Sequence, residues 1–234
     1  MNNKINIITI IPARGGSKGI PGKNLMNFCG QPLVAWSIIQ AKNSKNVNEV
    51  YVSSDCDDIL SIADSFKAIP IRRPDEYASD AATSESALIH ALDVIEKKKS
   101  NKVDLVVYLQ PTSPLRDPED IDNALKTFFD VNADSLFSAA VLDDFCVWKK
   151  EGDALTGLSF DPFHRGRRQD KEPMYLETGS IYIFWPKILR QFNNRFGGRI
   201  EMFEMSYWKS YEIDTMKDIE ICEYFFRKYL LHKY

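Results

Sequence analysis

The chain has 234 residues, enough to bury a sizeable core and suited to one α/β domain with an appendage or to two small domains. Its formal net charge is −3 and its pI is near 5.7, and no basic stripe dominates the sequence, which argues against nucleic acid as the main partner. The four cysteines stand far apart without a CxxC pair, a pattern typical of reduced thiols and not of a disulfide framework or a zinc site.

No segment of the sequence indicates export or a membrane. The apolar part of the N-terminal stretch is too short for a signal peptide, and no apolar run approaches membrane-spanning length. We therefore expect a soluble, cytoplasmic protein.

The first half of the chain alternates strand and helix signals. Short apolar runs predict strands at Ile5–Ile11, Glu49–Ser53, Ala68–Ile71 and Val103–Leu109. Apolar residues at helical spacing predict helices at Pro32–Ala41, after a cap at Asp57, at Ser84–Lys98, and after Asp117, where a cap, a proline and acidic residues coincide. Strands alternating with helices predict parallel βαβ units, and hence an α/β fold with a mostly parallel, doubly wound sheet.

The alternation breaks after Ser135. Two short strands are predicted at Ser135–Leu142 and Phe145–Lys149, and the polar stretch from Gly152 to Pro173 resembles an inserted arm or loop. The remaining elements are predicted as strands at Gly179–Trp185 and Ile200–Met205, and helices at Pro186–Phe192 and Thr215–Leu231, with Asp214 placed to cap the last helix.

The most informative segment is Ile10–Asn24, IIPARGGSKGIPGKN, which follows the first strand. Its glycines let backbone N–H groups approach an anion, and its arginine and lysines offset negative charge. The segment is neither a Walker loop nor a dinucleotide-binding fingerprint, because it lacks GxxxxGK[ST] and GxGxxG. An ordinary glycine-rich connection stays open as an alternative, but the three basic residues favour an anionic ligand such as a polyphosphate.

Other predicted strand ends also carry polar groups. Ligands of open α/β sheets bind at the carboxyl ends of strands, where this sequence places Arg72 and Arg73, the run Ser79–Ser84, and Gln110–Arg116. No Ser-His-Asp order or catalytic cysteine setting is evident, and with only three histidines, histidine-based acid–base chemistry is not expected.

A metal site is suggested by Glu212 and Asp214. On an extended segment, residues i and i+2 point to the same side, so the two carboxylates could together bind Mg²⁺. The alternative is that Asp214 only caps the last helix while Glu212 is solvated.

Four motifs, in order and spacing, resemble the CMP-sialic acid synthetase (acylneuraminate cytidylyltransferase) family over essentially the whole chain. They are IIPARGGSKGIPGKN, RRPDEYASD, LQPTSPLR and GSIYIF with the later EIDT. The resemblance implies a Rossmann-like three-layer sheet, a single nucleotidyltransferase domain over 1–234, and an inserted dimerisation and substrate arm at about 140–176. It implies that CTP and a nonulosonic acid give a CMP-sugar and pyrophosphate with Mg²⁺, in a cytoplasmic homodimer serving cell-surface polysaccharide synthesis.

The resemblance also implies residue roles. Arg14, Lys23 and Asp214 would be catalytic, and Glu212 would join Asp214 at the metal. The nucleotide-binding set would be Arg14, Gly15, Ser17, Lys23, Asn24, Arg73 and Ser84. The sugar-binding set would be Gln110, Arg168 and Tyr182. Basic residues of the arm, such as Arg165 and Arg167, either complete the neighbouring subunit's sugar site or lie in a solvated loop.

The chain departs from the family pattern at two places. Glu212 stands where family members usually have aspartate, and Glu177-Thr178 precede Gly179 where the sialic acid enzymes carry asparagine before the glycine. The identity of the sugar is therefore open, with a legionaminic-type acid as credible as sialic acid. A CMP-Kdo synthetase-like enzyme and a non-catalytic nucleotide- or sugar-binding homologue are the alternative functions.

Overall fold

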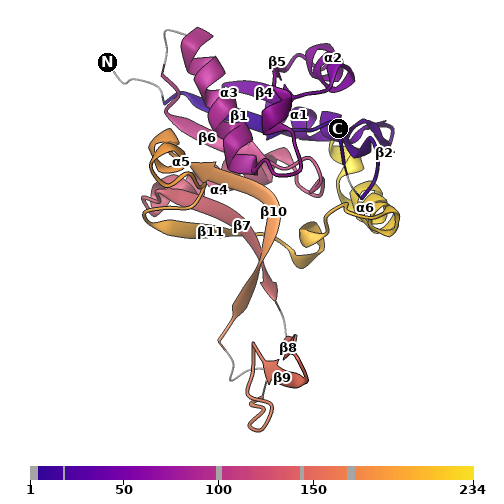
Figure 1. The fold of residues 1–234 in the computed structure, drawn as a ribbon, viewed down its shortest axis with the longest axis vertical. Helices are drawn as coiled ribbons and strands as arrows, with labels where there is room; N and C mark the ends of the chain where they lie inside the picture. The colour runs from indigo at the N-terminus through magenta and orange to yellow at the C-terminus, as the bar shows by residue number, and fades with distance from the viewer. Residues whose placement is uncertain (1–4, 18, 99–101, 143–144, 168–171) are drawn as a thin grey trace.

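The computed structural model describes residues 5–17, 19–98, 102–142, 145–167 and 172–234. Within them, one seven-stranded sheet has the order β11-β7-β10-β6-β1-β4-β5 (Figure 1). Its strands are β1 (Ile7–Pro12), β4 (Glu49–Ser54), β5 (Ile69–Arg72), β6 (Leu105–Leu109), β7 (Ser135–Leu142), β10 (Met174–Phe184) and β11 (Ile200–Glu204). Only β10 among these strands pairs antiparallel with its neighbours. The expected mostly parallel, Rossmann-like sheet is confirmed.

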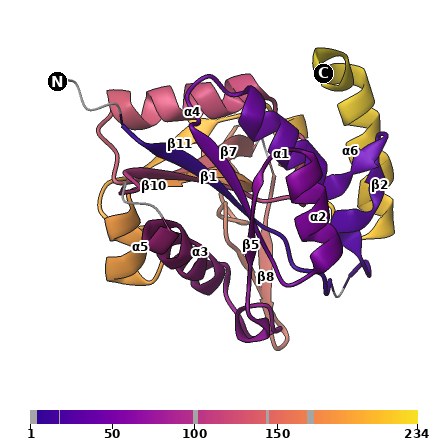
Figure 2. The same ribbon diagram turned by 90° about the horizontal axis from the view of Figure 1, so that it is seen from above.

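Helices cover both faces of the sheet (Figure 2). One face carries α1 (Leu33–Asn43), α2 (Asp57–Ser65) and α4 (Pro118–Asp130), and the other carries α3 (Ser84–Lys98) and α5 (Pro186–Phe192). The last helix, α6 (Met216–Tyr229), packs beside α1 and the small β2–β3 hairpin (Asn27–Phe28 and Gln31–Pro32). Short 3-10 turns complete the chain at η1 (Lys23–Leu25), η2 (Asp75–Tyr77), η4 (Tyr207–Ser210) and η5 (Leu231–Lys233).

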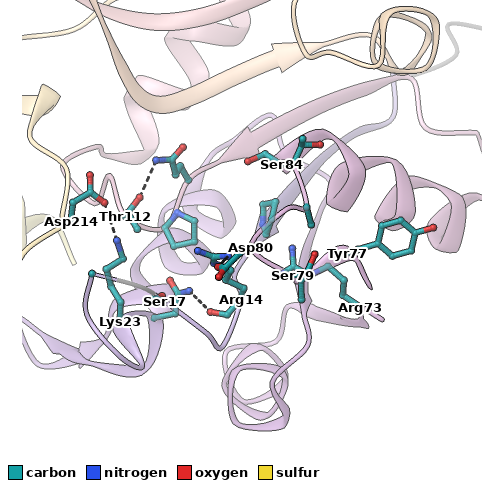
Figure 3. A pocket seen from close by; sticks show the side chains of 18 of the residues that line it. Arg14, Ser17, Lys23, Arg73, Tyr77, Ser79, Asp80, Ser84, Thr112 and Asp214 are labelled. Carbon is teal, nitrogen blue, oxygen red and sulfur yellow. Dashed lines mark hydrogen bonds and ion pairs between the residues drawn. The ribbon is translucent and has the colours of Figure 1, made fainter. Parts of the chain in front are cut away.

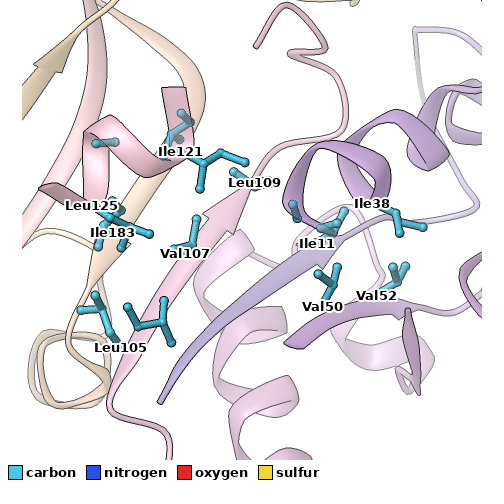
Figure 4. Close-up of a cluster of buried hydrophobic side chains, with 14 of the residues drawn as sticks. Ile11, Ile38, Val50, Val52, Leu105, Val107, Leu109, Ile121, Leu125 and Ile183 are labelled. Atoms are coloured by element: carbon cyan, nitrogen blue, oxygen red, sulfur yellow. The ribbon is translucent and has the colours of Figure 1, made fainter. Parts of the chain in front are cut away.

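The strand β1 shows why the sheet strands are mostly apolar on both faces. Ile7 and Ile11 face the cluster under α1, α2 and α4, whereas Ile8 and Ile10 face the cluster under α3 and α5. Figure 4 shows the first of these clusters, in which Ile11 lies near Ile38 of α1. A strand buried on both faces has a nearly continuous run of apolar residues and not an alternating one, although β1 also buries Thr9.

Three helix starts were predicted from capping residues, and one prediction is confirmed. Asp117 caps α4 and forms a reciprocal capping box with Asp120. The predicted cap Asp57 is wrong, because Asp57 is the first helical residue of α2 and instead pairs with Arg72 at 2.5 Å. The predicted cap Asp214 is also wrong, because Thr215 is the N-cap of α6. These corrections free both carboxylates for interactions with other parts of the chain.

The inserted segment forms a small hairpin that projects from the body of the molecule (Figure 1). It consists of β8 (Trp148–Glu151) and β9 (Ala154–Gly157), and the paired ends of β7 and β10 form its stem. The strand expected at Phe145–Lys149 is therefore shifted, and β9 was not expected. The missed signal is the two-residue turn at Gly152, whose φ of 58° suits a tight hairpin.

No helix among the described residues is both long and apolar enough to span a bilayer.

Candidate functional site

A cavity of about 560 Å³ opens at the carboxyl ends of β1 and β6 (Figure 3). Most of the residues predicted to bind nucleotide line it, although they come from five separate stretches of the chain. The predicted residues that line the cavity are Arg14, Ser17, Lys23, Asn24, Arg73, Ser84, Gln110 and Asp214. The strand ends thus converge where the topology of an open α/β sheet requires.

Hydrogen bonds with Asn24 and Asp55 hold the glycine-rich loop in place. Asn24 donates its amide N–H to the carbonyl of Arg14 at 2.9 Å, and the backbone N–H of Gly15 donates to Asp55 at 3.0 Å. Gly15 does not line the cavity, and a Cβ at this position would lie 2.8 Å from that of Cys56. Gly15 is therefore a packing requirement of the loop, which brings the neighbouring Arg14 to the cavity.

Lys23 is a buried cation at the floor of the cavity. Its side-chain ammonium donates to the carbonyl of Ile213 at 2.6 Å and pairs with Asp214 at 3.1 Å. Both partners lie about 190 positions later in the sequence. The segment before α6 thus closes one side of the site and fixes the direction of the lysine.

Arg73 is a buried arginine in the wall of the cavity. Its side chain is only 5 % exposed, and its nearest carboxylate, Asp55, lies 3.5 Å away. Within the described residues, neither its Nε nor its Nη2 makes a hydrogen bond. Burial lowers the pKa of Arg73, and the carboxylate of Asp55 opposes this effect. Arg73 therefore brings a buried positive charge, partly balanced by Asp55, to the wall of the cavity, where it can pair with an acceptor group of a ligand.

The two predicted metal ligands lie in different environments. Asp214 lines the cavity and is well exposed, whereas Glu212 accepts a hydrogen bond from Gln110 at 3.2 Å and packs against Gly179. Burial, followed by the charge of Asp214, raises the pKa of Glu212. The described residues contain no group of three or more His, Cys, Asp and Glu suited to a metal. One carboxylate nevertheless fits Mg²⁺, which is commonly bound by one or two carboxylates plus substrate phosphates.

The three predicted sugar-binding residues have different outcomes. Gln110 lines the cavity. Tyr182 is buried, stacks on Tyr108 at 5.1 Å and donates its hydroxyl hydrogen bond to Glu177. Arg168 lies outside the described residues.

Sequence reasoning assigned no role to several residues of this region. Asp55 holds both Gly15 and Arg73, and Asp80 pairs with Arg14 at 3.2 Å. Other unassigned residues that line the cavity are Tyr77, Ser79, Thr83, Tyr108 and Thr112. The sequence did place Ser79, Asp80 and Thr83 near a strand end. A polar run before a helix does not, however, indicate which distant residue it will contact, here Arg14.

Comparison with known proteins agrees with this geometry. Residues 8–228 match the family model described as Cytidylyltransferase. N-acylneuraminate cytidylyltransferase of Oncorhynchus mykiss is 34% identical over 226 residues, covering 94% of this chain but 50% of the relative. Pseudaminic acid cytidylyltransferase of Campylobacter jejuni is 30% identical over 94% of this chain and 96% of the relative. CMP-N,N'-diacetyllegionaminic acid synthase of Legionella pneumophila is 34% identical over 76% and 78% of the two chains.

Solved structures show the same fold. The structure of CMP:2-keto-3-deoxy-manno-octonic acid synthetase complexed with CTP superposes with a TM-score of 0.72 at 19% identity, covering 96% of this chain and 100% of the other. This chain spans about half the length of the fish relative and nearly the whole of the Campylobacter one. The match over residues 8–228 and the identities above 30% establish that the chain belongs to the cytidylyltransferase family.

Proposed function

We propose that this protein transfers the cytidylyl group of CTP to a nonulosonic acid and releases pyrophosphate. The observation that carries the proposal is the convergence of three cations, Arg14, Lys23 and the buried Arg73, on one cavity at the carboxyl edge of the sheet. A nucleoside triphosphate offers these cations phosphate oxygens and base acceptors. The relatives named for neuraminic, pseudaminic and legionaminic acids support an acylated nine-carbon acceptor.

The proposed chemistry is an in-line displacement at phosphorus. The anomeric hydroxyl of the acceptor attacks the α-phosphorus of CTP, a new oxygen–phosphorus bond forms, and the bond to the bridging oxygen of the β-phosphate breaks. Charge grows on the equatorial and leaving oxygens, so fixed cations provide most of the catalysis. Arg14, Lys23 and the loop amides would hold the triphosphate, while Arg73 and Ser84 would contact the cytidine.

We place Mg²⁺ at Asp214. When bound there, the metal would supply positive charge to the triphosphate. Glu212 would chiefly orient Gln110 by accepting a hydrogen bond from its side-chain amide, and it would reach the metal at most through water. The proton of the attacking hydroxyl is released to solvent water as the new oxygen–phosphorus bond forms.

The function is tested with a panel of acceptors and nucleotides. Neuraminic, legionaminic and pseudaminic acids and Kdo are each incubated with CTP, GTP or ATP, and pyrophosphate and CMP-sugar are measured, the latter by mass. We expect product with CTP and an acylated nine-carbon acid. Turnover of Kdo alone would favour the CMP-Kdo alternative, and absence of pyrophosphate with every pair would favour a non-catalytic binder.

We further propose a homodimer formed through the arm. The arm exposes several large apolar side chains that a monomer would leave in water. They include Trp148 at 46%, Leu155 and Leu158 at 62%, and Phe163 at 88% exposed. Packing against a second copy would bury them and bring the basic residues Arg165 and Arg167 toward the neighbouring sugar site.

We also propose a cytoplasmic location. Cys29, Cys56, Cys146 and Cys222 are all free thiols in the structure, as a reducing compartment allows.

A further inference from the structure

The strand β10 leaves regular pairing where it passes the candidate site. Glu177 is opposite Ala139 of β7, but Tyr182 is opposite Phe137, so four intervening residues bulge out against one. On its other edge, Ile181 is paired with Leu109, the last residue of β6. The bulge therefore lies at the carboxyl end of β6, directly beside Gln110. Bulges beside active sites commonly redirect a side chain.

Glu177 and Thr178, which enter this bulge, have opposite environments. Thr178 has no exposed surface, and its hydroxyl shares a 2.7 Å hydrogen bond with that of Ser138. It is part of the core and is not accessible to a ligand. Glu177 is exposed, and its carboxylate accepts a hydrogen bond from Tyr182. Of the two residues before Gly179, only Glu177 is exposed and thus accessible to a substrate.

Tyr182 is a rigid support for Glu177. Its ring is 3% exposed, and the guanidinium of Arg195 lies 4.4 Å from the ring centroid. Arg195 is itself fixed by an ion pair with Glu85 at 3.1 Å. Burial raises the pKa of Tyr182, and the hydrogen bond to Glu177 raises it further, so the phenol remains a donor. The carboxylate of Glu177 is thus held in place and keeps spare acceptor capacity.

A continuous chain of contacts links this support to the cavity. Tyr182 stacks on Tyr108, which lines the cavity and whose hydroxyl lies 3.4 Å from the amide oxygen of Gln110. Gln110 in turn donates to Glu212. The charge of Glu177 adds to the effects of burial and Asp214 that raise the pKa of Glu212. Glu177 therefore stands on the Gln110 side of the site, beyond the residues assigned to the triphosphate.

We propose that Glu177 determines which acceptor the enzyme uses, by accepting a hydrogen bond from an amide N–H or a hydroxyl of the sugar. Tyr182 is the positioning residue that aims the carboxylate. A carboxylate only accepts hydrogen bonds and repels other anions. It therefore favours the end of the acceptor that carries donor groups and turns the sugar's own carboxylate away. This inference rests on the proposed function and adds a selective group to it.

The test replaces Glu177 by glutamine, which keeps the shape and removes the charge. Steady-state kinetics are measured with CTP and acceptors that carry two acylamido groups, one, or hydroxyls alone. We expect the KM of the preferred acceptor to rise about tenfold or more, as for loss of a charged hydrogen bond, with the KM of CTP within about twofold of wild type. The acceptor whose KM rises most identifies amide or hydroxyl as the partner.

Tyr182→Phe serves as the second variant because it keeps the stacked ring and removes only the donor to Glu177. It should raise the acceptor KM in the same direction but less, with kcat little changed. Glu204→Gln, an exposed carboxylate at the end of the next strand but one, is the matched control and should leave both KM values unchanged. Thermal unfolding of each variant checks that it is folded, and calorimetric titration of the acceptor gives an affinity independent of turnover.

The outcomes separate this inference from the function on which it rests. Unchanged acceptor KM and affinity in a folded Glu177→Gln variant would overturn it, as would an equal rise in the KM of CTP. Wild-type protein that turns over no acceptor with CTP would overturn the proposed function and this inference together. Active wild type with a selective loss in the variant would support both.

Discussion

Lys23 is the residue whose environment most directly predicts a catalytic effect. Its ammonium is buried and contacts the carbonyl of Ile213 and the carboxylate of Asp214. If the lysine is removed, solvent water therefore cannot supply the same charge to a bound triphosphate. We expect Lys23→Ala to reduce kcat at saturating CTP by about 100-fold or more, the scale of deleting one transition-state contact. The control is Lys217→Ala, which removes an exposed lysine of α6. A kcat within tenfold of wild type would exclude Lys23 from the transition state.

The two acidic residues before α6 should differ in their metal dependence. Asp214 lines the cavity, whereas Glu212 is directed at Gln110. We expect Asp214→Ala to abolish most turnover even at saturating Mg²⁺, and Glu212→Gln to raise the acceptor KM with a nearly unchanged Mg²⁺ titration. The measurement is initial rate against Mg²⁺ concentration for both variants. Near-normal turnover of Asp214→Ala would remove the metal assignment.

At the scale of elements, the C-terminal turn η5 is tied to the start of α4 by charge. Lys233 pairs with Asp117 at 2.8 Å, and the buried Lys209 lies near both Asp117 and Asp120. Burial acts to raise the pKa of Asp117, but Lys233 and Lys209 outweigh it and hold this pKa below its usual value. For Asp120, burial outweighs Lys209 and the pKa is raised. The contribution of Asp117 to stability is therefore present above its unfolded pKa and lost as the pH falls through its folded pKa.

Removing Lys233 should consequently have a pH-dependent cost. We expect Lys233→Met to lower the free energy of unfolding by about 0.5–1 kcal/mol at pH 7, a modest value because the lysine is partly exposed. The deficit should shrink as the pH falls from about 4, the ordinary pKa of an aspartate, through the lower folded pKa of Asp117, because a protonated Asp117 no longer attracts Lys233. Urea unfolding at pH 7, 4.5 and 3.5 gives the comparison. A deficit that is constant with pH would show that packing, and not charge, carries the effect.

The arm is the element that should control association. Replacing Leu155, Leu158 and Phe163 by serine removes apolar surface without touching the sheet. We expect this variant to be monomeric in sedimentation equilibrium, to bind CTP normally and to bind the acceptor more weakly. Ile221→Ser, at an exposed apolar position on α6, should leave the dimer intact. Equal acceptor affinity in monomer and dimer would refute a contribution of the arm to the neighbouring site.

The same elements show what the sequence could predict. The bounds of α3 and α5 were predicted correctly because their apolar spacing and the proline that begins α5 are local signals. The first half of β10 and the whole of the hairpin strand β9 were missed, because exposed arm strands have little apolar patterning and are defined by their partners. The polar and basic residues that follow the predicted strands correctly indicated where the cavity lies. The pairing of Lys23 with Asp214 and the burial of Arg73 could not be predicted, since both depend on contacts between distant segments.

At the scale of the whole molecule, the acceptor side of the site and the arm belong to one structural unit. The paired strands β7 and β10 form the stem of the arm at one end and carry the Glu177 bulge where they join the sheet. The phosphate side is instead built from β1, β5 and the segment before α6. If the proposed roles hold, nucleotide binding and acceptor selection are assigned to different elements. We therefore expect association through the arm to change acceptor affinity and to leave CTP affinity unchanged.

The nucleotide side should accordingly stabilise the whole fold when it is filled. Ligand at 100 times its Kd adds about 2.7 kcal/mol to the free energy of unfolding, which for a chain of this length corresponds to a rise in Tm of roughly 5–10 °C. We expect CTP to produce this shift in wild type, ATP to produce little, and Arg73→Met to abolish the response to CTP while remaining folded. Differential scanning calorimetry at fixed protein concentration measures all three. An equal shift with ATP would show that the site does not select the cytosine base. A full response to CTP in Arg73→Met would show that Arg73 does not contact the cytidine.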